Sequence, residues 1–162
     1  MNKRSQARQI AMQCLYQMDL VKADLDDALE YFKQQDTAED VLDLARPLAD
    51  GAFSHREQID NILRRHLHRS DFERLGKVEK AILRLGVYEL LHQLAVPPKV
   101  ALNEAVELAK EFTTQKSVRF VNGVLDNCAK ELRPAPAEPR KPRPKRKPGP
   151  EPKAKPDKAS PK

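Results

Sequence analysis

The chain has 162 residues, of which 33% are charged and 5% aromatic, and its formal net charge is +6. This length is sufficient for one domain with a hydrophobic core. Two cysteines are too few for a disulfide framework, no apolar run reaches the roughly 20 residues of a membrane-spanning helix, and the start MNKRSQARQ lacks the apolar centre of a signal peptide. We therefore expect a soluble cytoplasmic protein with two buried free thiols.

The charge is unevenly distributed along the chain. Residues 134–162 contain ten prolines, ten lysines or arginines and three acidic residues, whereas residues 1–133 contain 20 basic and 21 acidic residues. A segment rich in proline and lysine buries too little apolar surface to offset its ordering entropy. The sequence thus predicts a folded domain over residues 1–133 and a disordered basic tail over residues 134–162, which can attract polyanions without choosing a sequence.

The first predicted helix spans about residues 5–20, with Ser5 as its N-cap. Lys3, Arg4 and Arg8 cluster at its start, where the helix dipole disfavours cations. A charge cluster is usually only a solvated face. Cations at the unfavourable end of a helix nevertheless favour a bound polyanion.

Two helical patterns follow. Residues 25–34 are predicted to form a short amphipathic helix that Asp24 caps. From Thr37 to Leu67 the apolar residues keep one helical period, and Pro47 is expected either to kink this helix or to mark a new first turn. The two histidines near its end are two residues apart, so they would not face each other and a metal site is not expected.

A central helix is predicted over residues 77–94, because apolar residues cover two of its faces. A short helical turn over residues 70–75 precedes it. Lys77, Lys80 and Arg84 form a basic row along the central helix. A solvated edge and a functional surface are equally consistent with this row.

The last two predicted helices cover about residues 103–112 and 117–132. Three glutamates at helical spacing in the first of them are expected to form an exposed acidic edge, since no ligand motif adjoins them. In the second, Asn122 and Gly123 are a hairpin signal, but the surrounding apolar residues recur at helical spacing and favour a helix. Gly123 is then expected to let another helix approach closely.

Lys116, Arg119 and Phe120 lie near the beginning of the last helix. Free N–H groups and a partial positive charge at a helix N-terminus suit phosphate, and cations beside an aromatic ring suit single-stranded RNA. We expect this helix beginning to lie beside the cationic start of the first helix and form one RNA-binding strip. By residue type alone, Phe120 is more often a core residue than a platform for a base.

No strand-like run of useful length occurs, so the predicted fold is all-α, with six or seven helices in two sub-bundles that share the helix over residues 77–94. The glycines are isolated and the cysteines lack activating neighbours. No cofactor, metal or catalytic site is therefore predicted.

Four stretches together resemble a known family. GKVEKAILRLGVYELL, PPKVALNEAVELAKEF and VRFVNGVLD, with ARQIAMQCLYQMD in the first helix, are similar to the bacterial transcription antitermination factors of the NusB family. The resemblance covers roughly residues 4–133, and the blocks occur in order at the expected separations. It implies a NusB-like bundle of about seven helices and an RNA-binding adaptor. Family members pair with NusE, also a small-subunit ribosomal protein, and bind the boxA element of nascent RNA. They help RNA polymerase read through terminators, notably in ribosomal RNA operons, and aid rRNA maturation.

The resemblance also implies roles for individual residues. Arg4 and Arg8 match the family's N-terminal basic motif that contacts RNA, and Arg119, Phe120 and Asn122 lie in the segment that matches the family's KFVNG motif, which faces RNA. Lys3 and Lys116 join this candidate RNA-binding group because they are cations at the same two helix beginnings, not because of the resemblance. Tyr16 and Glu89 match positions on the side that faces NusE. Two departures stand out. The N-terminal motif is usually richer in arginine, which should weaken attraction to RNA here, and Lys116 stands where relatives often carry an acid.

Two other functions and the oligomeric state are weighed against this interpretation. A NusB-like domain also precedes the catalytic domain of some rRNA cytosine methyltransferases, but only the basic tail follows Arg133 here, so an enzyme is not expected. A purely architectural ribosome-assembly or rRNA-processing scaffold would bind its partner without preferring any RNA sequence. Some relatives also pair with themselves through surfaces used for RNA, and the sequence does not decide whether the free protein is a homodimer.

Overall fold

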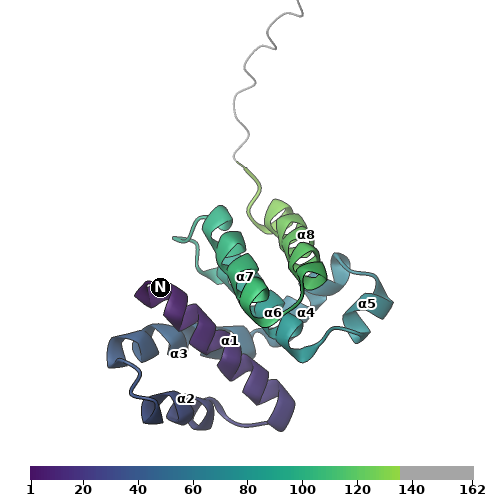
Figure 1. The fold of residues 1–162 in the computed structure, drawn as a ribbon. Coiled ribbons are helices and arrows are strands. Elements are labelled where there is room, and N and C mark those ends of the chain that lie inside the picture. The colour runs from purple at the N-terminus through teal and green to yellow at the C-terminus, as the bar shows by residue number, and fades with distance from the viewer. Residues whose placement is uncertain (136–162) are drawn as a thin grey trace, which may run out of the picture.

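The computed structural model describes residues 1–135, and the regular structure within that range consists of eight α-helices (Figure 1). They are α1 (Lys3–Val21), α2 (Leu25–Gln34), α3 (Glu39–Ser54), α4 (Arg56–Arg65), α5 (Arg69–Glu73), α6 (Lys77–His92), α7 (Pro98–Phe112) and α8 (Gln115–Leu132). The predicted all-α class is confirmed. Nearly all of the predicted basic tail lies outside the described residues, so the division of the chain at residue 133 stays a prediction.

The two sub-bundles meet on α6. α1 and α3 pack against it from one side, with α2 completing their layer, and α4, α7 and α8 pack against it from the other (Figure 1). Ile82, Leu83, Val87 and Leu90 on α6 are almost completely buried. A helix that is apolar on most sides needs neighbours on most sides, so the predicted sharing of this helix by two sub-bundles is confirmed.

α1 runs antiparallel to α6. Arg8 near the start of α1 pairs with Glu89 near the end of α6. Asp19 near the end of α1 pairs with Lys77 at the start of α6, 3.1 Å apart. The cationic start of α1 therefore lies beside the C-terminal half of α6.

α8 runs parallel to α6. Near its start, the Ser117 hydroxyl donates a hydrogen bond to Glu79 (2.8 Å) on the first turn of α6. At its end, the Arg133 guanidinium donates to the carbonyl oxygens of Leu90 (3.5 Å) and Val96 (3.0 Å). These carbonyls lie at and just beyond the end of α6, where the helix itself supplies no donor, so Arg133 acts as a cap.

The helix caps match the sequence in part. α1 begins two residues earlier than expected, because Asn2 rather than Ser5 is the N-cap and its side chain accepts a hydrogen bond from the Ser5 N–H (2.8 Å). Asp24 caps α2 as predicted, accepting from the Asp27 N–H (2.8 Å).

The apolar pattern after Thr37 forms two helices, not one. α3 begins at Glu39 without a side-chain cap, so the expected start at Thr37 is wrong. Pro47 lies inside α3 rather than at a new first turn. The break instead falls at His55, whose Nδ1 lies 2.8 Å from the Gly51 carbonyl oxygen. This division is why eight helices are found where six or seven were expected.

Close helix approach depends on a different glycine from the one expected. A Cβ added at Gly86 on α6 would lie 2.9 Å from a methyl carbon of Leu125 on α8, whereas a Cβ added at Gly123 would meet nothing within 4 Å. The expectation that Gly123 admits a neighbouring helix is therefore wrong. Gly86 has this role, because it lets α8 pack directly on the backbone of α6.

Both cysteines are buried free thiols, as expected. Burial raises the pKa of Cys14 and of Cys128 to about 12, so both remain protonated and unreactive.

Among residues 1–135, no group of three or more His, Cys, Asp or Glu side chains is placed to hold a metal ion. The described helices include none that is long and apolar enough to cross a membrane.

Candidate nucleic-acid and partner interface

The start of α1 presents two exposed cations. Lys3 contacts the Asp40 carboxylate at the start of α3, and this hydrogen bond holds the pKa of Asp40 below its usual value. Arg4 is exposed and forms no ion pair within the described part of the chain. Lys3 and Arg4 are thus both accessible to a phosphate backbone.

Arg8 differs from the exposed RNA contact expected of it. Its side chain is 7% exposed, and its Nε donates to both carboxylate oxygens of Glu89 (2.9 and 3.0 Å). A further nitrogen lies 3.6 Å from a Glu104 oxygen on α7. Arg8 therefore fastens α1 to α6 and α7, and its charge is already neutralised.

Glu89 is likewise less accessible than its expected partner-facing role requires. It is only 2% exposed, and Arg8 occupies both of its oxygens. Burial raises the pKa of Glu89, and the Arg8 guanidinium opposes that rise. The pair lies at the wall of a hollow of about 110 Å³ that Arg4, Pro47 and Leu48 also line. The reason for the discrepancy is that both residues lie on the apolar sides of their helices, where only mutual pairing makes charge burial tolerable.

The beginning of α8 gathers the other predicted RNA residues. Thr114 is the N-cap and accepts a hydrogen bond from the Ser117 N–H (3.2 Å). Lys116 and Arg119 are exposed, and Phe120 is half-buried against the core. Spacings of three and four residues place these three side chains on one face of the helix. Asn122, on the following turn, is also exposed. Phe120 is thus partly a core residue, and its use as a platform for a base stays a prediction.

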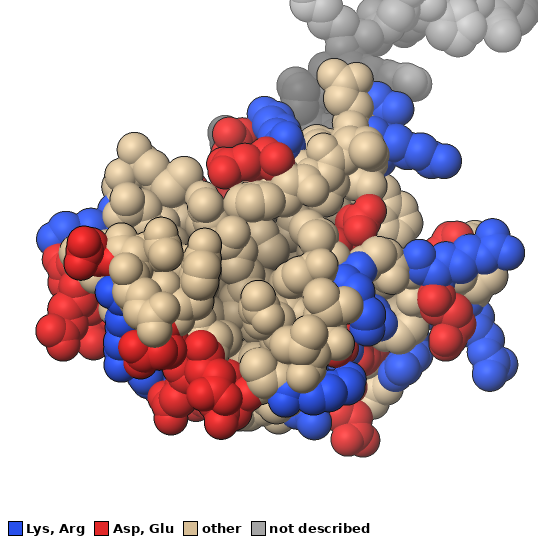
Figure 2. Space-filling model, turned by 60° about the horizontal axis from the view of Figure 1, so that its bottom comes forward, with Lys and Arg blue, Asp and Glu red and all other residues tan. Residues whose placement is uncertain are grey.

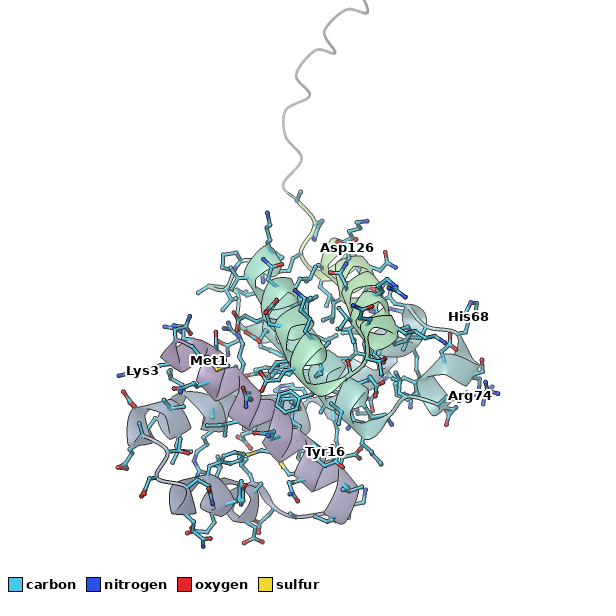
Figure 3. All side chains as sticks on the ribbon, in the orientation of Figure 1. Met1, Lys3, Tyr16, His68, Arg74 and Asp126 are labelled. Atoms are coloured by element: carbon cyan, nitrogen blue, oxygen red, sulfur yellow. The ribbon has the colours of Figure 1, made fainter. Side chains whose placement is uncertain are left out.

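The two cationic helix beginnings do not lie side by side, so that expectation is wrong. α1 is antiparallel to α6 and α8 is parallel to it, which places the two beginnings toward opposite ends of α6. In Figure 3 Lys3 lies at the far left end of α1, whereas the first turn of α8 lies over the middle of the molecule. The sequence could not reveal this, because packing direction is a property of the fold.

A shallow hollow of about 580 Å³ lies beside the first half of α1. Its other walls are the end of α2, the turn that leads into α3, and Glu111 at the end of α7. Gln6, Gln9 and Gln13 line it from α1. Carboxamides both donate and accept hydrogen bonds, as the edges of nucleic-acid bases do. Sequence reasoning missed these glutamines, because polar residues on an exposed helix face carry no distinct signal.

Tyr16 lines an open groove of about 470 Å³ between α1 and α2. Tyr31 and Phe32 form the opposite wall, their rings edge to face at 5.1 Å, and Tyr31 is 59% exposed. One acidic residue of α2, Asp27, borders the groove. An exposed tyrosine beside an apolar groove is typical of a protein-binding surface. Tyr31 was missed, because helical spacing places it away from the buried stripe of α2.

The basic row of α6 separates into unlike parts. Arg84 is half-buried and donates to both oxygens of Asp60 (2.8 and 2.7 Å), which ties α6 to α4. Lys77 pairs with a carboxylate of α1. Lys80 lies over the ring of Phe72 on α5, 5.1 Å from its centroid. Arg84 therefore has a structural role, whereas Lys80 lacks a carboxylate partner within residues 1–135.

The three glutamates of α7 form the expected acidic edge only in part. Glu107 is exposed and pairs with Lys110 on the same helix (3.0 Å). Glu111 is exposed as well, while Glu104 is half-buried and faces Arg8.

Comparison with known proteins gives consistent matches over the same residues. The model of the NusB family matches residues 5–130. Transcription antitermination protein NusB of Myxococcus xanthus is 38% identical over 134 residues, covering 80% of this chain and 96% of that protein. Its counterpart in Aeromonas hydrophila is 44% identical over 132 residues, covering 81% and 96%. One chain in the crystal structure of antitermination factors NusB and NusE in complex with dsRNA is 34% identical, with a TM-score of 0.73, covering 81% of this chain and 98% of that one.

Proposed function

Because the chain belongs to the NusB family, we propose that it is a transcription antitermination factor that binds boxA-type single-stranded RNA together with NusE. In this role it joins the RNA polymerase antitermination complex on nascent ribosomal RNA transcripts in the cytoplasm and aids rRNA maturation. The observation that carries the proposal is the beginning of α8, where exposed Lys116 and Arg119 adjoin the half-buried ring of Phe120. Such a site offers charge for the RNA backbone and a flat face for one base.

The RNA path runs from the start of α1 to the start of α8. Lys3 and Arg4 attract the backbone at one end, and Lys116, Arg119 and Phe120 hold it at the other. In this proposal the RNA passes the hollow beside the first half of α1, whose glutamines supply hydrogen-bonding groups. This path replaces the single strip of adjacent helix beginnings, and it leaves Arg8 as the residue that positions α1.

We propose that NusE binds at the groove between α1 and α2. Tyr16 and the exposed Tyr31 offer apolar contact area, and the acidic residues of α2 complement a basic ribosomal protein. Glu89 acts from beneath the surface, by holding Arg8 and hence the orientation of α1. If the free protein forms a homodimer through these surfaces, NusE and RNA would have to displace the second copy of the chain.

The test is a titration of boxA-like and scrambled RNA against the full chain, with and without NusE, at two salt concentrations. We expect a preference for boxA that NusE strengthens, and affinities that fall with salt. Equal affinity for both RNAs in the presence of NusE would favour the architectural scaffold instead. Sedimentation of the free protein, measured alongside, reports whether RNA binding is coupled to dissociation of a homodimer.

A further inference from the structure

A second group of cations lies apart from the proposed RNA path. Residues 61–80 contain six basic and three acidic residues, whereas the rest of residues 1–133 contains 14 basic and 18 acidic residues. Figure 2 shows several blue side chains on the right, over the α5 region, with a few red ones among them, and a larger red cluster at the lower left. His68 and Arg74 mark the same end of the molecule in Figure 3.

Four residues define what we call the α5 basic surface: Arg64, Arg69, Arg74 and Lys80. The guanidinium of Arg64 lies 4.4 Å from the centroid of the Phe72 ring, and the Lys80 ammonium lies 5.1 Å from it. Phe72 itself is only 4% exposed, so the ring is a fixed support that holds both cations in place. Arg69 and Arg74 are exposed beside them.

None of these four cations has a carboxylate partner within 4.0 Å among residues 1–135, in contrast to Arg65 and Lys77, which are paired. Asp71 and Glu73 are exposed on the same short helix and reduce the net charge of the surface to about +2 by simple count. Like charges gathered on one ring repel each other, so the arrangement favours an external anion.

Lys80 of the α5 basic surface and the beginning of α8 both lie at the first turn of α6. The hydrogen bond from the Ser117 hydroxyl to Glu79 joins the first turns of α8 and α6, and Lys80 is the next residue along α6. A strand that leaves Lys116 can therefore continue onto Lys80 and from there toward α5. We propose that the α5 basic surface binds the phosphate backbone of RNA that extends beyond the segment held at the start of α8. This inference rests on the proposed function.

A polyanion fits this surface better than an acidic protein does. The large apolar side chains that are exposed in residues 1–135 all lie elsewhere: Met1, Leu20, Val21, Tyr31, Leu94 and Val100. Stable protein interfaces have an apolar centre, which this surface lacks. Binding to a phosphate backbone requires only accessible cations at suitable places.

The test uses the full chain carrying Arg69→Gln and Arg74→Gln, compared with a matched control carrying Lys33→Gln and Lys99→Gln. All four side chains are exposed, and each variant removes two charges. Each protein is titrated with a boxA-like RNA of minimal length and with the same RNA extended by unstructured nucleotides at either end. Circular dichroism melts verify that both variants stay folded.

For the extended RNA, we expect the Arg69/Arg74 variant to bind several-fold more weakly at low salt. Its logarithmic salt slope should fall by up to about 1.4, or 0.7 for each phosphate that is no longer neutralised. The minimal RNA should bind unchanged, and the control variant should match the wild type with both. An unchanged slope with the extended RNA would overturn the inference. So would equal losses of affinity with minimal and extended RNA, or a loss only in binding to NusE. If wild type fails to prefer boxA over scrambled RNA, the proposed function fails, while the slope comparison still tests this surface.

Discussion

At the scale of single residues, Arg8 shows how a cation in a family motif can serve the fold. It is buried with Glu89, and the pair connects helices that are far apart in the chain. Removing one member of a buried ion pair leaves the other charge uncompensated. Replacing both by apolar residues of similar volume is often neutral.

We therefore predict that Arg8→Ala lowers the free energy of unfolding by about 3–5 kcal/mol, and that Arg8→Met combined with Glu89→Leu restores most of it. Urea unfolding measures both. If RNA binding recovers in the double variant, Arg8 positions α1 rather than contacting phosphate. A loss of stability below about 1 kcal/mol in Arg8→Ala would instead show that the pair behaves like a solvent-exposed salt bridge.

A second single residue with two possible roles is Phe120, whose half-buried ring packs against the core and is partly exposed. We expect Phe120→Ala to weaken RNA binding by about 1–3 kcal/mol, the range for stacking of a base on an aromatic side chain. Phe120→Leu separates the two roles, since it keeps apolar volume for the core but removes the flat face. Fluorescence titration with boxA-like RNA measures the affinity. Wild-type affinity in a folded Phe120→Leu protein would remove the ring from the RNA site.

At the scale of elements, the packing of α8 on α6 distinguishes two glycines. Gly86→Ala would place a Cβ 2.9 Å from Leu125, so we expect a loss of about 1–3 kcal/mol from overpacking. Gly123→Ala meets nothing within 4 Å and should stabilise α8 by up to about 1 kcal/mol, because alanine is the better helix former. Thermal unfolding of the two variants tests the contrast. The opposite order of stabilities would show that α8 approaches another helix at Gly123.

The junction of α4 and α8 should respond to acid. Arg65 and His66 hydrogen-bond to Glu131, the latter at 2.6 Å, and these hydrogen bonds lower the pKa of Glu131 from its ordinary value of 4.5. A carboxyl with a lowered pKa in the folded state stabilises the fold above the unfolded value, and this contribution disappears as the pH falls through the folded value.

Glu131→Gln should therefore destabilise the protein by at most about 1 kcal/mol near neutral pH, as expected of a partly exposed pair. The difference from wild type should shrink once the pH falls below 4.5. Urea unfolding across this range gives the comparison. A constant difference at all pH values would assign the effect to packing rather than to charge.

Periodicity predicted most of the helices, because burial of one apolar face imposes the same spacing whatever the neighbours are. Periodicity failed where contacts with another helix decide the local structure. The break at His55 carries no proline signal, and the proline that was available, Pro47, lies within a helix. Gly86 could not be preferred to Gly123, since close approach depends on which helix faces each glycine. The burial of Arg8 was hidden for the same reason: its partner is 81 residues away.

At the scale of the whole molecule, helix direction and charge distribution together define the surfaces. The antiparallel packing of α1 on α6 and the parallel packing of α8 separate the two cationic helix beginnings. The same packing places the start of α8 at the first turn of α6, which also carries Lys80. Asp27 on α2 borders the groove between α1 and α2. The hollow on the proposed RNA path and the groove proposed for the partner share Gln13 and Phe32, so the two proposed surfaces adjoin each other along α1.

The basic tail provides the last test at this scale. Residues 134–162 carry a net charge of +7, whereas residues 1–133 carry −1. A chain ending at residue 135 keeps Arg133, which donates to the Val96 carbonyl oxygen (3.0 Å) beyond the end of α6, so its thermal midpoint should match that of the full chain. Its affinity for scrambled RNA should fall, and the salt slope should decrease by up to about 0.7 for each phosphate that the tail had neutralised. Preference for boxA over scrambled RNA should rise, because the charged tail attracts every RNA alike. Equal slopes for the two chains would show that the tail does not touch the RNA backbone, and a lower preference for boxA would mean that it takes part in sequence recognition.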